Sequence, residues 1–222
     1  MTRVPIALCL LFACPAAAAE PPKLATKLET ADPPKELAGP VRALFDDRAV
    51  IVLDAAGEVC TLWLRKDIPA AATATERKAG LTYQAVGQTA IVGAIRLARP
   101  WTDFRTQEAP AGIYTLRFVL QPVSKDHEGT APHREFCVLS PAAADPKPDP
   151  LPLKKLVAQS GTITGGTHPV VMLLMPHPKP GAEPAIIRKG KAVAVGVRAV
   201  VKVGDEPAEL GFAFTLAGVW TD

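Results

Sequence analysis

The chain has 222 residues, of which 48% are hydrophobic and 21% charged, and its formal net charge is +3. A chain of this length forms one domain or two small ones and can bury a substantial core. Because the charge is close to neutral, nothing points to nucleic acid or an acidic membrane surface as a partner.

Residues 1–19 have the layout of a secretory signal peptide. Arg3 supplies an early positive charge, an apolar run spans residues 4–12, and four alanines close the segment. This order of charged, apolar and small residues is typical of a cleaved leader. We predict cleavage after Ala19 and therefore a periplasmic or secreted protein. The alternative is a lipoprotein anchored at Cys14.

Proline clusters punctuate the rest of the chain. Its 23 prolines are about twice the usual share, and proline ends helices and is excluded from central strands. Residues 20–47 are predicted to be a loose, proline-containing lead-in, and 48–222 a single domain. A proline-rich linker is expected near 141–152. No later segment is apolar over the roughly 20 residues that a transmembrane helix needs.

Short runs of alternating or continuous apolar residues predict strands along the whole domain. The clearest is GIYTLRFVLQ at 112–121, in which Tyr114, Leu116 and Phe118 alternate with polar residues. The other predicted strands are 49–53, 58–65, 81–86, 89–97, 134–140, 168–175, 191–203 and 209–219. Only LKKLVAQ at 153–159 has the pattern of a short helix.

Eight to ten strands with turn signals between them indicate an all-β fold. We predict an antiparallel β-sandwich, Ig-like or jelly-roll-like, with at most one short helix. A closed barrel is the alternative.

Several motifs resemble a family of secreted bacterial β-rich proteins that carry a domain of unknown function. They are PWTDFRTQEAPAGIYTLRFVLQP, DHEGTAP, REF, TLWLRK and GTHPVVM, and they extend from about residue 48 to 216. The resemblance implies export and a β fold and brings no activity with it.

Histidines in the segment SKDHEGTAPHREF suggest a metal site as one interpretation. His127 and His133 lie six residues apart, and His168 in GTHP could add a third ligand for zinc or copper. The spacings that place two histidines on one helical face are absent. The other interpretation is structural, with His127 bonding the backbone of its own loop.

Trp101, Asp103 and Arg105 form the candidate ligand-binding cluster. Trp101 follows a proline and precedes polar residues, so it is a candidate surface for a sugar ring, whereas aromatics within apolar strands are core candidates. Asp103 and Arg105 share a face if the segment is extended. Cys60 and Cys137 are a candidate disulfide, and two buried free thiols are the alternative.

No motif for nucleophilic catalysis is present, since Ser160 misses the G-x-S-x-G pattern. We therefore predict an exported, non-catalytic β-sandwich with no cofactor and a binding or structural role at the cell envelope. Its expected partner is an envelope glycan or another envelope protein. The alternative is a metal-binding protein or a metal-dependent hydrolase that uses the histidines.

Overall fold

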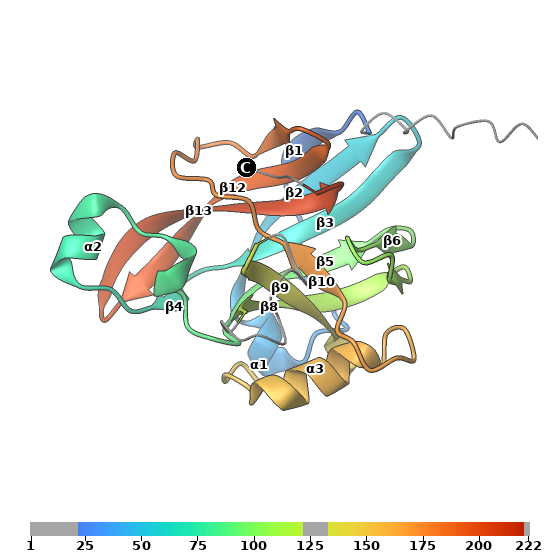
Figure 1. Ribbon diagram of the computed structural model, residues 1–222, viewed down its shortest axis with the longest axis horizontal. Coiled ribbons are helices and arrows are strands. Elements are labelled where there is room, and N and C mark those ends of the chain that lie inside the picture. The colour runs from blue at the N-terminus through green and yellow to red at the C-terminus, as the bar shows by residue number, and fades with distance from the viewer. Residues whose placement is uncertain (1–21, 122–132, 220–222) are drawn as a thin grey trace, which may run out of the picture.

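The computed structural model describes residues 22–121 and 133–219, which form two packed antiparallel sheets (Figure 1). Sheet A has the strand order β1-β2-β3-β5-β8-β9-β10, with β1 (Ala25–Thr30), β2 (Phe45–Asp54), β3 (Gly57–Arg65), β5 (Ile91–Leu97), β8 (Gly112–Leu120), β9 (Glu135–Pro141) and β10 (Val171–Leu173). Sheet B consists of β11 (Ala185–Lys189), β12 (Ala192–Val203), β13 (Glu206–Ala217) and β4 (Ile68–Ala70), the last paired in parallel with β12. A small ribbon joins β6 (Trp101–Thr102) and β7 (Glu108–Ala109).

Helices are few, and the predicted antiparallel sandwich is confirmed. The α-helices of the described residues are α1 (Gly39–Arg42), α2 (Ala74–Ala79) and α3 (Leu153–Gly161), and single 3₁₀ turns lie at Tyr83–Ala85 and Ala142–Ala144. Only α3 is longer than six residues, and it coincides with the helix predicted at 153–159. Figure 1 shows α1 and α3 below sheet A, and the long β12–β13 hairpin reaching toward α2. The strands form two sheets and not one closed sheet, so the barrel alternative is wrong.

Strand alternation builds the core between the two sheets. Positions two apart on each strand face inward, because successive side chains of a strand point to opposite faces. The inward set includes Val50, Val52, Leu62, Leu116 and Phe118 from sheet A and Val195, Val197, Phe212 and Phe214 from sheet B. These residues form one continuous apolar cluster, which fixes the register of both sheets.

The predicted lead-in contributes a strand to the sandwich. Residues Ala25–Thr30 form β1 and pair with β2 from Ala25 opposite Leu53 to Thr30 opposite Arg48. Leu28 packs against the core cluster, which explains why this polar segment adopts a strand. The first strand therefore begins well before residue 48.

The proline-rich segment at 141–152 is fixed to sheet A by one buried arginine. Arg117 on β8 donates from Nε and Nη2 to the Asp145 carboxylate at 2.8 and 2.7 Å. Its guanidinium also donates to the backbone oxygens of Thr89, Lys147 and Asp149 at 2.7, 2.8 and 3.0 Å. Because the side chains of Arg117 and Asp145 are 0% and 1% exposed, the ion pair is part of the interior.

The outer face of the β12–β13 hairpin is crossed by the chain at His177. This crossing depends on glycine, since a Cβ on Gly211 would lie 2.0 Å from the His177 carbonyl oxygen. Burial against the sheet lowers the pKa of the His177 imidazole.

Gly211→Ala is expected to lower the free energy of unfolding by about 1–3 kcal/mol, the usual cost of overpacking. The added methyl must displace the backbone of His177, and backbone cannot rotate away as a side chain can. Gly39→Ala is the matched control, because a Cβ there has nothing within 4 Å. Urea unfolding of both variants would measure the difference, and equal stabilities would contradict the close approach.

No helix within the described residues is both long and apolar enough to cross a lipid bilayer.

Candidate functional site

The two sheets meet and then separate along the edges of β10 and β13. Leu174 and Phe214 form an antiparallel bridge, and the Met175 N–H donates to the Ala213 oxygen at 2.9 Å. Continued in that register, Val171 would lie opposite Ala217, but the strands have parted there. The segment that contains β6 and β7 lies beside this opening and lines it together with β10 and β13.

Trp101 attaches that segment to sheet B. Its indole Nε1–H donates to the backbone oxygen of Leu216 at 2.8 Å, and the residue is only 9% exposed. Because Trp101 packs against the core cluster, it does not present a free ring face on the surface. Its ring instead forms a wall of the opening between the sheets.

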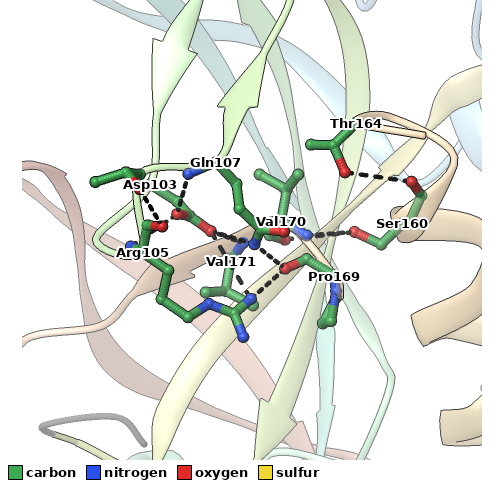
Figure 2. A network of polar contacts seen from close by, with 10 residues as sticks. Asp103, Arg105, Gln107, Ser160, Thr164, Pro169, Val170 and Val171 are labelled. Atoms are coloured by element: carbon green, nitrogen blue, oxygen red, sulfur yellow. Dashed lines mark hydrogen bonds and ion pairs between the residues drawn. The ribbon is translucent and has the colours of Figure 1, made fainter. Parts of the chain in front are cut away.

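Asp103 attaches the same segment to sheet A (Figure 2). Its Oδ1 accepts hydrogen bonds from the backbone N–H groups of Arg105 and Gln107 at 2.8 and 3.0 Å. Its Oδ2 accepts from Gln107 Nε2 at 3.0 Å and from the Val171 N–H on β10 at 3.3 Å. The carboxylate is fully buried, and Arg105 Nη2 forms an ion pair with its Oδ2 at 3.8 Å. Asp103 therefore shapes the site rather than facing a ligand.

Residues 169–171 form hydrogen bonds with residues 103–107 on one side and with α3 on the other, as Figure 2 shows. Gln107 Nε2 donates to the Pro169 oxygen at 2.8 Å, and the Arg105 guanidinium donates to the same oxygen. From the other side, the hydroxyl of Ser160 accepts from the Val170 N–H at 2.9 Å. The strand β10 is thus held in place at its beginning.

Two clefts share Trp101 as a lining residue. The first, the Thr215 cleft, has a volume of about 230 Å³ and is lined by Trp101–Phe104, Val171, Leu173 and residues 215–219. Thr215 contributes a buried hydroxyl that has no hydrogen-bond partner among the described residues. A buried hydroxyl without a partner is costly, and Thr215 is among the residues that line this cleft.

The second, the Arg99 cleft, has a volume of about 340 Å³. It shares Trp101, Thr102 and residues 216–218 with the first cleft and adds the ion pair of Asp54 and Arg99. The hydrogen bond from Arg99, followed by that from the Ala56 N–H, lowers the pKa of the Asp54 carboxyl. The site therefore combines an indole edge, a hydroxyl and a charged pair.

The structure does not bring His133 and His168 together. In the β9–β10 register, Val171 lies opposite Val138, which carries His168 toward the end of β9, whereas His133 precedes its beginning. His127 lies outside the described residues. Within residues 22–121 and 133–219, no three His, Cys, Asp or Glu side chains are grouped so as to hold a metal ion.

The candidate disulfide is absent, because Cys60 and Cys137 are both free and buried. Cys60 lies on β3 and Cys137 on β9, with β5 and β8 between them. Three strand spacings amount to about 14 Å, whereas a disulfide requires Cα atoms about 4.4–6.8 Å apart. Burial raises the pKa of the Cys60 thiol to about 12 and also raises that of Cys137, so both stay protonated.

Thr215, Asp54 and Arg99 are residues of this site that sequence reasoning missed, and a signal was available for Thr215. It is the only polar residue in the run GFAFTLAG, and that break in an otherwise apolar run was the available signal. Position alone could not show that its hydroxyl lines a cleft, because the clefts exist only where β10 and β13 separate.

The fold and the site define an antiparallel β-sandwich with a partly polar cleft at the seam of its sheets. Comparisons with protein-family models, curated proteins and solved structures found no match. The resemblance to a secreted bacterial family stays a prediction from the sequence motifs.

Proposed function

We propose that this chain is an exported, non-catalytic β-sandwich of the cell envelope that binds a glycan at the clefts beside Trp101. The observation that carries the proposal is the arrangement around that indole: a fixed indole edge shared by two clefts, with polar residues lining each cleft. Export rests on the signal-like residues 1–19 of the sequence.

The clefts provide the contacts that a sugar ring requires. The indole edge of Trp101 would contact the apolar part of a sugar ring, and neighbouring polar groups would bond its hydroxyls. Thr215 offers an unpartnered hydroxyl in one cleft, and the Asp54–Arg99 pair offers both a donor and an acceptor in the other. The hydrogen bonds of Trp101 and Asp103 already fix the chain segment that lines the clefts. Binding therefore costs little conformational entropy in that segment.

The chemistry of the described residues favours binding over a thiol mechanism. A catalytic cysteine must be a thiolate, whereas both thiols here are buried and have raised pKa values. Neither cysteine lies at the clefts. The polar groups that do lie there suit recognition by hydrogen bonding.

Trp101→Phe is expected to weaken glycan binding about tenfold, which corresponds to ~1.4 kcal/mol, because the smaller ring withdraws the shared wall of both clefts. The ligand would first be found on a glycan array and then titrated by calorimetry. Trp63→Phe is the matched control, since Trp63 also donates its indole N–H to a backbone oxygen, that of Ala31 at 2.8 Å, but lines neither cleft.

Both variants lose one indole hydrogen bond, so similar losses of stability are expected from the two. An array without hits would contradict glycan binding. Equal glycan affinities of the two variants would show that Trp101 is not part of the binding site.

A further inference from the structure

One edge of β12 is interrupted in the middle of sheet B. On that edge β11 pairs with β12 as far as Gly196, and β4 pairs with it from Val201 onward. The opposite edge is taken by β13 along almost the whole strand. Residues 197–200 therefore have no partner strand on this edge within the described part of the chain, and we call this gap the β12 notch.

The notch has the dimensions of a short extended peptide. Four residues of a strand span about 13 Å, and alternate residues direct their N–H and C=O groups toward the same edge. The gap persists because Pro184, directly before β11, has no N–H with which to extend the pairing. An incoming segment of three or four residues could therefore add as a strand between β11 and β4.

A cavity opens at the same place. It has a volume of about 140 Å³ and lies between β12 and strands β1 to β3 of sheet A. Part of its apolar lining belongs to the core between the sheets, namely Leu28, Val50, Leu64, Val197 and Ala199, and Ala182, Pro184 and Val200 complete it. One apolar side chain of an added strand would point into this cavity, as alternate residues of a strand point inward.

The rim of the cavity is predominantly basic. Its charged lining residues are Arg48, Arg65, Lys66, Arg198 and a single acid, Asp46. Asp46 is 3.5 Å from Lys66, and Arg198 is 3.1 Å from Glu209 outside the cavity. The side chain of Arg48 is exposed and makes no hydrogen bond or ion pair with any described residue, although its backbone pairs with Thr30 of β1. The unpartnered guanidinium of Arg48 at the mouth of an apolar cavity can bind the anionic end group of a ligand.

We propose that the β12 notch binds the C-terminal end of an extended peptide, with an apolar last side chain in the cavity and the free carboxylate at Arg48 and Arg198. Backbone hydrogen bonds to residues 197–200 supply affinity, and the cavity and the cations supply selectivity. A fatty acid would satisfy the cavity and the cations but would leave the backbone edge of β12 unpaired, so the peptide fits more of the observations.

The test uses fluorescein-labelled hexapeptides ending in Thr-Val-Leu, measured by fluorescence anisotropy with the protein spanning residues 20–222. The free acid is expected to bind, while a C-terminal amide and a peptide N-methylated within the last three residues each bind at least about tenfold more weakly. These probes change only the ligand, so the folding of the protein does not enter the result. Octanoate at equal concentration is expected to compete poorly.

The protein variants test the rim separately. Arg48→Gln combined with Arg198→Gln is expected to weaken binding of the free acid about tenfold. Lys154→Gln with Lys155→Gln removes the same charge from exposed positions of α3 and is expected to have no effect. Trp101→Phe is also expected to have no effect, which keeps this site distinct from the glycan site.

Several results would overturn the proposal. Equal binding of acid and amide would exclude carboxylate recognition, and equal binding of the N-methylated peptide would exclude strand addition. Full displacement by octanoate would make the cavity a fatty-acid site, and no binding of any peptide at millimolar concentration would leave the notch without this partner.

Discussion

Asp145→Asn is expected to lower the free energy of unfolding by about 3–5 kcal/mol, the range found when one member of a buried ion pair is removed. The substitution keeps the shape of the side chain and removes only its charge. Arg117 is then left with an uncompensated positive charge, at a position where its side chain is 0% exposed. A guanidinium cannot escape this cost by losing its proton.

The loss of stability extends beyond the Arg117–Asp145 pair because the Asp145 carboxylate also accepts a hydrogen bond from a neighbouring hydroxyl. Asp145 Oδ2 accepts from the Thr115 hydroxyl as well as from Arg117 Nε. The guanidinium in turn holds the backbone oxygens of Lys147 and Asp149. The proline-rich segment is also held by two hydrogen bonds between Thr89 and Leu151 and by one from Gln159 to the Ala144 oxygen. We therefore expect residues 145–149, which Arg117 and Asp145 hold, to loosen from sheet A in the variant.

Urea unfolding followed by circular dichroism would measure this change, and limited proteolysis would show whether cleavage appears at 141–152. Asp46→Asn is the matched control, because the Asp46–Lys66 pair is exposed and pairs of that kind contribute about 0–1 kcal/mol. A loss no larger for Asp145→Asn than for the control would show that the segment is held by something else.

Arg117 also shows what strand alternation can and cannot predict. The alternation of Tyr114, Leu116 and Phe118 correctly predicted β8 and its inward face. It predicted that the opposite face is exposed to solvent, yet Thr115 and Arg117 on that face are both 0% exposed. Alternation distinguishes two faces, and only distant segments decide whether the outer face is covered.

The strand order of a sheet is the second feature that local patterns did not supply. Cys60 and Cys137 both lie in apolar strands, which the sequence showed, but the two strands between them come from the intervening chain. Strand pairing also separates His133 from His168. Each precedes its own strand, and because β9 and β10 are antiparallel, the two histidines lie at opposite ends of the strand pair. By contrast, Asp103 and Arg105 were expected to share a face of an extended segment, and they do form an ion pair, but within a turn.

Asp103→Asn is the second large effect, with an expected loss of about 2–4 kcal/mol in the free energy of unfolding. An amide can still accept at one oxygen, but its NH₂ group would face Gln107 Nε2 or the Val171 N–H, which are donors themselves. The buried site would then contain opposed donors and no charge beside Arg105.

This substitution also connects stability with the proposed glycan site, because Asp103 ties the Trp101 segment to β10 while Trp101 ties it to β13. When the hydrogen bond between Asp103 and Val171 weakens, the clefts should widen and water should reach the Trp101 indole. Glycan affinity should fall, and the tryptophan emission should shift to longer wavelength. Glu108→Gln, an exposed change in the same ribbon, should alter neither emission nor stability. If Asp103→Asn matched Glu108→Gln in both measurements, the four hydrogen bonds to the carboxylate would not be what holds the sheets' seam in shape.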